Sequence, residues 1–438
     1  MRRGTTTRRT FLKTTAGAAA VVAAGLASAP RVHAEGSDLL KIGIIGCGGR
    51  GMGAVRNNFD AVENTQLVAM GDMFEDRAKN AQGAIKEAMG DRVDVPDSRV
   101  FHGFDNYKGV IEASDVVLIA CASRFHPFYT KTAVEAGKHV FCEKPHGIDS
   151  LGVHVTLEAA ELAAEKGTAL VSGLCYRYDT LRREAVEQIR NGLIGDVNAI
   201  QCDYVRSPYS MLKRVEGWSE LEYQFRNWYH FTWLSGDEIM QSLLHNLDSM
   251  LWILNEETPV SCYGIGGRSA MYVPEYGDWF DHTAVIYDFA DGKRIYGMTR
   301  GVDKCYYSNM DVIHGTKGRC VYHATDTPYI TDLAGKEIWR PAAPRQRDMY
   351  VQEHYDMINS IMSGTPINDG QRMAKTTMVA VLGMIASRNG QQVSYQELFD
   401  SGFTFGPAED AFKPDMTPPV APEENGLYPV AKPGTTVY

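Results

Sequence analysis

A glycine-rich turn near the start of the chain has the residue types that can hold a pyrophosphate. The pattern G-x-G-x-x-G spans residues 46–51, directly after a short β-branched run at 41–45 and before a helix-like segment. Glycines at these positions allow a tight turn and a close backbone approach, so that a pyrophosphate can sit at the helix N-terminus. The residues expected to contact it are Gly46, Gly48, Gly49, Arg50 and Gly51.

An acidic residue follows at the distance that ribose recognition requires. A second strand-like run, residues 66–71, ends in Asp72, which lies 21 residues after Gly51. A carboxylate there hydrogen-bonds the hydroxyls of an adenosine ribose and repels a 2′-phosphate. The pattern therefore predicts a dinucleotide site that holds NAD rather than NADP.

Further polar side chains follow two later strands of the same predicted sheet. The runs 115–120 and 139–142 are apolar and strand-like, and a helix-like segment separates them. Because the carboxyl ends of parallel strands face the ligand crevice, we expect the residues after them to lie beside the nicotinamide half. For Lys144 the alternative is a position on the solvated surface. These residues are Ser123, Arg124, His126, Glu143 and Lys144.

These motifs resemble those of the Gfo/Idh/MocA family, which includes glucose-fructose oxidoreductases and inositol dehydrogenases. The most specific of them is Glu-Lys-Pro at 143–145, after the fifth strand. The chain also resembles the NAD-dependent glycoside hydrolases of the α-N-acetylgalactosaminidase type, which have the same fold. The matching segments cover about residues 38–400 and are 44–51, 135–145, 191–195, 245–248 with Trp252, and 315–318.

The resemblance implies an α/β protein in which a Rossmann domain precedes an α/β domain with a large, mostly antiparallel open sheet. Alternating apolar and polar residues at 199–205 and 282–289 agree with half-buried strands of such a sheet. A Pro-rich end indicates an extended arm or a disordered tail. The expected divisions are 1–34 for a signal peptide, 35–160 for the Rossmann domain, 161–405 for the substrate and oligomerisation domain, and 406–438 for the arm.

The catalytic roles also come from the resemblance. It implies that Lys144 and His245 handle the proton of a sugar hydroxyl while the nicotinamide takes the hydride. Taken alone, a histidine in an apolar helix is more often a core residue. Many relatives carry an Asp four residues before this histidine, whereas Gln241 of this chain cannot ionise. We rank His245 as the main base and Lys144 as the group that polarises the substrate oxygen, and the choice between them stays open.

Other candidates are aromatic and polar residues of the second domain. Aromatic faces stack on sugar rings, and Arg, Asn and His side chains bind hydroxyls in fixed geometry. Each of these residues could equally serve in the core or at an interface. Tyr178 is the third catalytic candidate. The substrate-binding candidates are Arg177, Trp228, His230, Gln241 and Asp248.

The composition favours a globular enzyme without a metal site. The eight cysteines are scattered and form no C-x-x-C pair, which is typical of buried free thiols. Without residues 1–34 the chain has 38 basic and 54 acidic residues, a net charge of −16. Such a charge argues against binding to nucleic acid or anionic membranes. A chain of 438 residues is long enough for two domains with sizeable cores.

The N-terminal residues have the pattern of a twin-arginine signal. Arg8 and Arg9 precede an Ala-rich run at 16–29, and residues 32–34 fit an A-x-A-like cleavage site. A membrane anchor is the alternative, but the run is shorter than the roughly 20 apolar residues that a span needs. Twin-arginine signals are addresses that an export machinery reads. We therefore expect a folded protein in the periplasm or another extracytoplasmic space, without stable membrane insertion.

Export limits the choice of function, because no supply of NAD is expected outside the inner membrane. Two kinds of relative avoid this problem by keeping the nucleotide tightly bound. The primary expectation is a sugar or polyol oxidoreductase that forms a homo-oligomer through its second-domain sheet. The alternative is a redox-neutral glycoside hydrolase that oxidises, eliminates, adds water and reduces again. A non-catalytic sugar- or NAD-binding protein is the minor alternative.

The double substitution Arg8→Lys with Arg9→Lys tests the signal. We expect this variant to stay in the cytoplasm, folded and able to bind nucleotide, because the export machinery reads the arginine pair. Cell fractionation with immunodetection measures the outcome. Export at the normal level would show that the segment has been misread.

Overall fold

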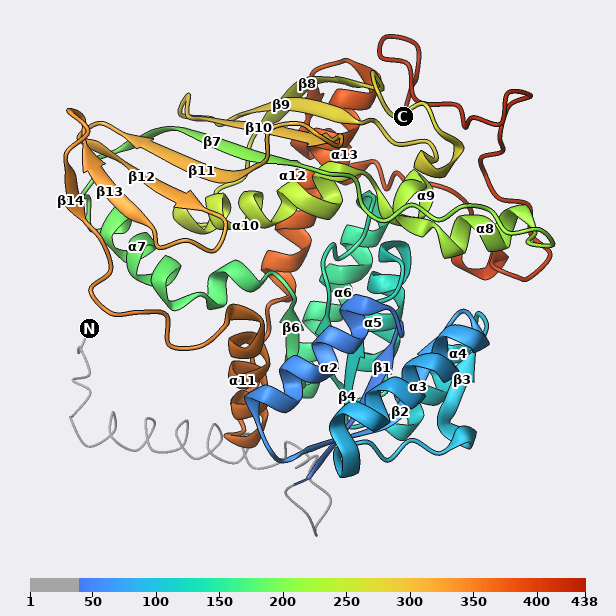
Figure 1. The fold of residues 1–438 in the computed structure, drawn as a ribbon. Helices are drawn as coiled ribbons and strands as arrows, with labels where there is room; N and C mark the ends of the chain where they lie inside the picture. The colour runs from blue at the N-terminus through green and yellow to red at the C-terminus, as the bar shows by residue number, and fades with distance from the viewer. Residues whose placement is uncertain (1–38) are drawn as a thin grey trace, which may run out of the picture. The chain divides into compact units, whose positions relative to one another are not determined.

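The computed structural model describes residues 39–438, so the expected signal peptide lies outside the described residues. Two sheets organise this part of the chain (Figure 1). Strands between residues 40 and 172 form a parallel sheet, and strands between residues 197 and 394 form a larger mixed sheet. None of the described helices is long and apolar enough to cross a membrane.

The first sheet has the strand order of a dinucleotide-binding domain. Its strands pair in parallel, and their apolar residues are buried on both faces. This confirms the predicted Rossmann domain, although the sixth strand lies beyond the expected boundary at residue 160. In spatial order the strands are β3 (Val100–His102), β2 (Thr65–Asp72), β1 (Leu40–Ile45), β4 (Val116–Ile119), β5 (His139–Cys142) and β6 (Leu170–Ser172). The helices are α2 (Gly49–Ala61), α3 (Glu75–Met89), α4 (Asn106–Ala113), α5 (His126–Glu135) and α6 (Ser150–Lys166).

The second sheet has nine strands, and every pair except β7 with β10 is antiparallel. Buried and exposed residues alternate along β10, as expected for a sheet with one open face. The predicted mostly antiparallel sheet is thus confirmed. In spatial order the strands are β14 (Glu337–Trp339), β13 (Tyr329–Asp332), β12 (Gly318–His323), β11 (Ser308–Gly315), β7 (Val197–Arg206), β10 (Arg294–Gly301), β9 (His282–Asp288), β8 (Ser261–Gly267) and β15 (Val393–Ser394).

The remaining helices include a short π-helix that precedes α10. The α-helices are α7 (Thr180–Arg190), α8 (Glu220–Arg226), α9 (Thr232–Ser235), α10 (Leu244–Ile253), α11 (Met349–Met362), α12 (Gly370–Asn389) and α13 (Tyr395–Asp400). The π-helix is η6 (Ile239–Leu243), and the 3-10 turns are η1 (Gly90–Arg92), η2 (Asp97–Arg99), η3 (Ser123–Phe125), η4 (Cys175–Tyr178), η5 (Trp228–His230), η7 (Pro274–Tyr276) and η8 (Glu409–Ala411).

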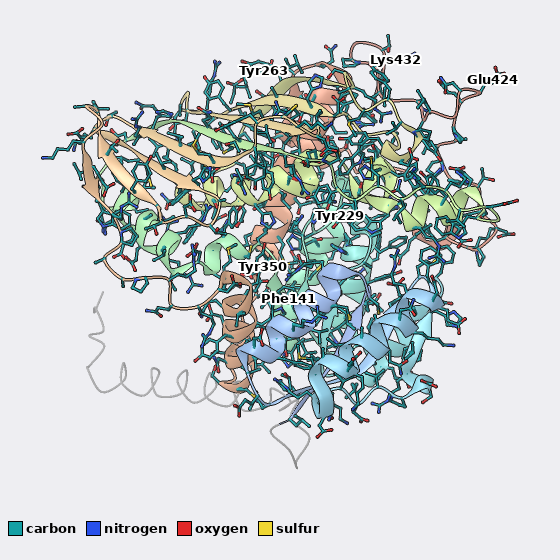
Figure 2. All side chains as sticks on the ribbon, in the orientation of Figure 1. Phe141, Tyr229, Tyr263, Tyr350, Glu424 and Lys432 are labelled. Atoms are coloured by element: carbon teal, nitrogen blue, oxygen red, sulfur yellow. The ribbon has the colours of Figure 1, made fainter. Side chains whose placement is uncertain are left out.

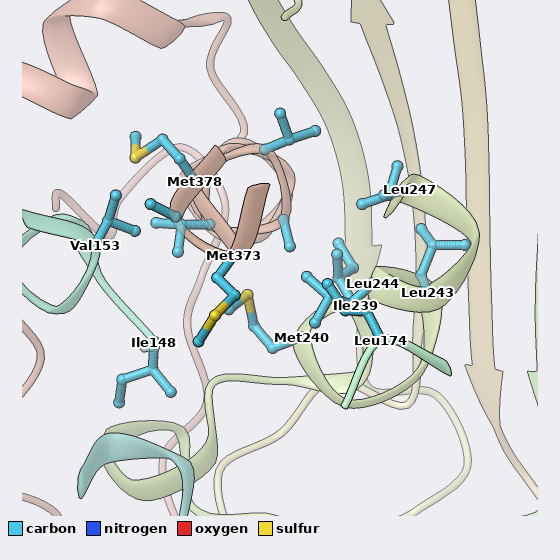
Figure 3. Close-up of a cluster of buried hydrophobic side chains, with 14 of the residues drawn as sticks. Ile148, Val153, Leu174, Ile239, Met240, Leu243, Leu244, Leu247, Met373 and Met378 are labelled. Carbon is cyan, nitrogen blue, oxygen red and sulfur yellow. The ribbon is translucent and has the colours of Figure 1, made fainter. Parts of the chain in front are cut away.

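Helix α12 joins the two halves of the core. Sixteen of its residues are buried, and Met373 and Met378 lie among apolar side chains of both domains (Figure 3). On one side they are close to Ile148 and Val153 of the first domain, and on the other to Met240 of η6. This packing fixes η6 and α10 relative to the parallel sheet.

The C-terminal segment 406–438 has little regular structure but packs on the body of the protein. Arg124, expected beside the nicotinamide, instead donates hydrogen bonds to the backbone carbonyls of Phe405 and Pro407. Phe412 packs 4.9 Å from the ring of Phe125, and Tyr428 packs edge-on against Phe231 at 4.9 Å. The segment is therefore an ordered arm that covers part of both domains.

Candidate active site

The glycine turn after β1 leaves room for a pyrophosphate. Gly46 has a φ of +97°, and a Cβ on Gly51 would lie 1.9 Å from the Gly46 carbonyl oxygen. These two positions therefore require glycine. A Cβ on Gly48 or Gly49 would meet nothing within 4 Å, so this side of the turn faces open space at the N-terminus of α2. The cradle fits the expected dinucleotide.

Asp72 lies at the end of β2, beside the same cradle. Its carboxylate accepts hydrogen bonds from the backbone N–H groups of Cys47 at 2.8 Å and Phe74 at 3.0 Å. Burial raises the pKa of this carboxyl, and the nearby Arg77 guanidinium opposes the shift. The two backbone bonds fix the carboxylate at the wall of the crevice, where the ribose is expected.

We name this space the nucleotide crevice. From the first domain it is lined by Gly46, Gly48, Gly49, Arg50, Asp72 and Phe74. From the second domain it is lined by Phe225, Trp228 and Tyr229. The crevice is thus a space between the two domains, and the predicted phosphate and ribose residues lie together in it.

A second space, here named the reaction pocket, adjoins the nucleotide crevice. Both spaces are lined by Arg50, Cys121, Trp228 and Tyr229. Figure 2 shows Tyr229 and Tyr350, which line the pocket, at the junction of the two domains. Seven predicted residues line it: Arg50, His126, Glu143, Lys144, Trp228, Gln241 and His245. The tyrosines that line it are Tyr204, Tyr209, Tyr229 and Tyr350.

Lys144 reaches from the end of β5 toward the second domain. Its ammonium group donates a hydrogen bond to the backbone carbonyl of Gln241 in η6. Desolvation lowers the Lys144 pKa to about 8, and the Arg206 guanidinium acts in the same direction while Glu143 opposes it. A substantial charged fraction thus remains at neutral pH, and the charge faces the pocket rather than solvent.

His245 enters the pocket from the first turn of α10. Burial lowers its pKa well below the usual value, and the charges of Lys144 and Arg182 add to this effect. Its ring packs 5.1 Å from Tyr176, whose hydroxyl accepts a 2.9 Å hydrogen bond from Asn309. The imidazole is therefore neutral, held in place, and able to accept a proton.

Gln241 ties the two domains together with both its side chain and its backbone. The side-chain amide donates to Ser123 Oγ at 3.0 Å and to the Ser235 carbonyl at 2.6 Å. Its own backbone carbonyl accepts from Lys144. Ser123, expected to contact the cofactor, is thus engaged with Gln241. The position that relatives fill with an acid has a structural role in this chain.

Arg50 spans the two spaces through an ion-pair network. Its guanidinium pairs with Glu143 and lies 3.6 Å from the fully buried Glu353 of α11. It also lies 4.8 Å from the centre of the Tyr350 ring. His126, the other predicted cofactor contact, has its ring nitrogens 2.7 Å from the Pro145 carbonyl and 3.1 Å from the Cys121 carbonyl.

The predicted substrate-binding roles of Arg177 and Asp248 are wrong, because the two side chains pair with each other beneath the site. Arg177 forms hydrogen bonds with both carboxylate oxygens of Asp248, at 2.7 to 3.0 Å, and with Glu256. Asp248 is fully buried and also accepts from Thr376. Because all three nitrogens of the Arg177 guanidinium donate to carboxylates, the side chain has no pair of N–H groups left to bind a sugar. This pair holds α10 against η4 and α12.

The predicted catalytic role of Tyr178 and the predicted substrate-binding role of His230 are also wrong. The Tyr178 hydroxyl donates to Asp369 at 2.9 Å in a cluster with Arg372. His230 is fully buried, 5.1 Å from the ring of Tyr276 and 5.4 Å from that of Trp279. Neither residue lines the nucleotide crevice or the reaction pocket. Tyr178 instead packs in the buried cluster that contains the strands of the parallel sheet, and His230 packs inside the second domain.

The described residues contain no group of three His, Cys, Asp or Glu side chains arranged to hold a metal ion. All eight cysteines are free thiols, and Cys305 alone among them is exposed. Sequence reasoning missed Tyr204, Tyr209 and Tyr350. Tyr204 and Tyr209 lie on β7 and in the coil after it, and the only signal was the density of aromatic residues between 204 and 233.

Comparison with known proteins places the first domain in a family. Residues 40–174 match the model GFO_IDH_MocA, described as an oxidoreductase family with an NAD-binding Rossmann fold. The chain is 26% identical over 259 residues to inositol 2-dehydrogenase of Serratia proteamaculans, covering 58% of this chain and 66% of the relative. It is 27% identical over 186 residues to glycosyl hydrolase family 109 protein 4 of Phocaeicola vulgatus, covering 42% and 34%. The matches thus span between one third and two thirds of these two relatives' own length.

Solved structures share the fold of both domains. An aldose-aldose oxidoreductase from Caulobacter crescentus, complexed with glycerol, superposes with a TM-score of 0.64 at 20% identity, over 81% of this chain and 99% of that one. A scyllo-inositol dehydrogenase from Lactobacillus casei with bound NAD(H) and scyllo-inositol gives 0.61 at 21% identity, over 82% and 99%. At these identities the likeness concerns the fold.

Proposed function

Residues 40–174 place this chain in the Gfo/Idh/MocA oxidoreductase family, and from that premise we propose that it oxidises a hydroxyl of a sugar or polyol with a tightly bound NAD. Lys144 and His245 meet in one pocket beside the nucleotide crevice. This juxtaposition is the observation that carries the proposal. A sugar-dependent rise in NADH absorbance of the purified protein tests it.

The enclosure of the nucleotide crevice supports tight binding. We name residues 220–230, which form α8 and η5, the strap. The strap supplies Phe225, Trp228 and Tyr229 to the crevice lining. Those side chains belong to the opposite domain, so a nucleotide bound at the glycine turn would contact both domains.

Contacts at the edge of the strap hold it against the first domain. Both terminal nitrogens of Arg226 lie 3.2 Å from carboxylate oxygens of Asp76 on α3. The same guanidinium lies 3.9 Å from the centre of the Phe74 ring. Phe225 packs edge-on against Phe104 at 5.5 Å. An ion pair, a cation–π contact and an aromatic pair thus close the crevice.

The pocket residues divide the proton chemistry. When bound, the nicotinamide supplies a hydride acceptor. Charged Lys144 binds the substrate oxygen and favours its negative charge. Neutral His245 accepts the hydroxyl proton. Tyr229 is stacked between Tyr209 and Trp228, so the other ring face of Trp228 is the stacking surface offered to a sugar. Gln241 acts only by positioning, because its amide is already bonded to Ser123 and Ser235.

The alternative is a redox-neutral glycoside hydrolase with the same bound nucleotide. The similarity to a glycosyl hydrolase family 109 protein favours it over other second choices. The two functions differ in what the protein releases. Purified protein without added NAD is mixed separately with chromogenic glycosides and with free sugars. Aglycone release identifies the hydrolase, whereas NADH absorbance with free sugars identifies the oxidoreductase.

The choice of NAD over NADP rests on Asp72. Its carboxylate should accept the ribose hydroxyls and repel a 2′-phosphate. We expect Asp72→Ala to weaken NAD binding more than NADP binding, by on the order of 1.5 to 3 kcal/mol for each lost charge-assisted hydrogen bond. Calorimetry on apoprotein measures both affinities. A wild type that prefers NADP, with Arg77 pairing the phosphate, would contradict the assignment.

Removal of Lys144 or His245 should abolish most of the turnover. Each substitution by Ala should lower kcat about 100-fold to 10,000-fold, the usual range for a general acid or base, while NAD binding barely changes. The double variant should be little worse than the worse single one. Because the Lys144 pKa is lowered to about 8, wild-type kcat/KM should fall as pH rises through about 8. If the His245→Ala variant folds and turns over at the wild-type rate, His245 is not the base.

Export and assembly complete the proposal. The twin-arginine pattern at Arg8 and Arg9 supports transport of the folded holoprotein. The open face of the second sheet supports a homo-oligomer, because Ile265, Tyr296 and Met298 are exposed there and Tyr263 lies on the same outer side (Figure 2). Light scattering of the mature protein and of Ile265→Lys would test whether this face joins two copies.

A further inference from the structure

A chain of three hydroxyl and carboxyl groups leads from the reaction pocket into the second domain. Tyr209, which lines the pocket, has its hydroxyl 3.0 Å from Ser242 Oγ. Ser242 Oγ in turn donates to Glu238 Oε1 at 2.7 Å. Ser242 is fully buried and Glu238 is 3% exposed. Within the described residues, Glu238 Oε2 has no hydrogen-bond partner.

This chain begins beside the two predicted proton-handling residues. The Tyr209 hydroxyl donates to the Gln241 carbonyl oxygen at 2.9 Å, and the same oxygen accepts from Lys144. Tyr209 is held in place by Tyr229, stacked at 4.5 Å, and by the Arg206 guanidinium, 3.7 Å from its ring centre. The phenol is therefore a fixed part of the pocket wall rather than a mobile side chain.

We propose that Tyr209, Ser242 and Glu238 form a proton relay that takes up the proton released by substrate oxidation and returns it on reduction. This inference rests on the proposed function. In the oxidising direction the substrate O–H bond breaks, and its proton passes to the Tyr209 oxygen, directly or from His245. The Tyr209 hydroxyl, which donates to the Gln241 carbonyl at rest, rotates toward Ser242 and passes its proton there, and the Ser242 proton moves to the Glu238 carboxylate. The electron pair leaves the substrate carbon as hydride for the nicotinamide, so atoms and charges balance.

A proton relay is needed if the nucleotide stays bound between the two half-reactions. The oxidising and reducing half-reactions occur on one bound nucleotide, so a proton taken in the first must be available for the second. His245 holds a proton weakly, because burial and the charge of Lys144 lower its pKa well below the usual value. Burial raises the Glu238 pKa to about 7. Glu238 therefore keeps the proton that the imidazole gives up. Glu238 thus supplies, from a different position, the carboxylate that many relatives have where this chain has Gln241.

Several charged or titratable groups influence Glu238. Arg206 and Lys144 favour its charged form, as does the hydrogen bond from Ser242, and Asp237 disfavours it. The tyrosines whose own titration is coupled to Glu238 are Tyr204, Tyr209, Tyr229 and Tyr276. The Tyr209 pKa is raised well above its usual value by burial and by Glu238. Tyr209 thus stays protonated and passes a proton only by gaining one as it loses another.

The test follows a single reduction of the bound nucleotide by D-glucose or myo-inositol between pH 5 and 9. In wild type the rate should rise with pH through about 7, because Glu238 must be deprotonated to accept the proton. Tyr209→Phe, Ser242→Ala and Glu238→Gln should each slow the step at pH 8 by about 10-fold to 100-fold. Each should also lose the rise near pH 7, while the fall above pH 8 from Lys144 remains as an internal control.

Asp237→Asn is the matched control for the loss of a buried carboxylate. Asp237 is the neighbouring residue, 1% exposed, and its carboxylate accepts from the backbone N–H groups of Ile239 and Met240, which an amide oxygen can replace. This variant should keep the rise in rate, shifted to slightly lower pH because a negative charge beside Glu238 is lost. A rise that persists unchanged in Glu238→Gln would overturn the relay.

An infrared titration separates the relay from the proposed function. The difference spectrum of wild type minus Glu238→Gln should contain a protonated-carboxyl band that disappears as pH rises through about 7. If no sugar reduces the nucleotide, the proposed function fails, and this band still decides whether Glu238 can store a proton. Absence of the band at every pH would overturn the relay even in an active enzyme.

Discussion

The pocket depends on one contact between the domains, the hydrogen bond from Lys144 to the backbone carbonyl of Gln241. An ammonium group taken out of water needs a hydrogen-bond acceptor. The π-helix η6 supplies that acceptor. The side chain of Gln241 then bonds to Ser123 of the first domain, so the two domains hold each other at a fixed separation. This link, together with the packing of α12, brings Lys144, His245 and Tyr209 into one pocket.

The same contacts support the proposed retention of a nucleotide cofactor and, with it, the proposed export of the folded protein. The strap lies across the nucleotide crevice, and Arg226 fastens it to Asp76 and Phe74. Phe412 of the C-terminal arm packs against Phe125 behind it. These contacts join the two domains and the arm. The proposed retention of the cofactor and the proposed folding before export thus depend on the same interactions.

Sequence patterns within one strand and the turn after it predicted the site residues whose positions depend on that local structure. The glycine turn, Asp72 and Lys144 each follow a buried strand, and the strand order brings them to one edge. Side-chain direction over long distances was not predictable in this way. Arg177 meets Glu256 from 79 residues away, and Tyr178 meets Asp369 from 191 residues away, so both face the core instead of a sugar. The ion pair between Arg226 and Asp76 joins residues 150 positions apart and has no local signal.

Retention of the nucleotide is the central claim, and its content in desalted protein tests it most directly. Mature wild type should keep NAD through prolonged dialysis, whereas Arg226→Gln should lose it, because both the ion pair and the contact with Phe74 are removed. Arg214→Gln, which alters an exposed pair with Glu220 in the same region, should behave like wild type. Mass spectrometry of the nucleotide released on denaturation gives the result. Wild type that loses NAD as fast as Arg226→Gln would contradict the account.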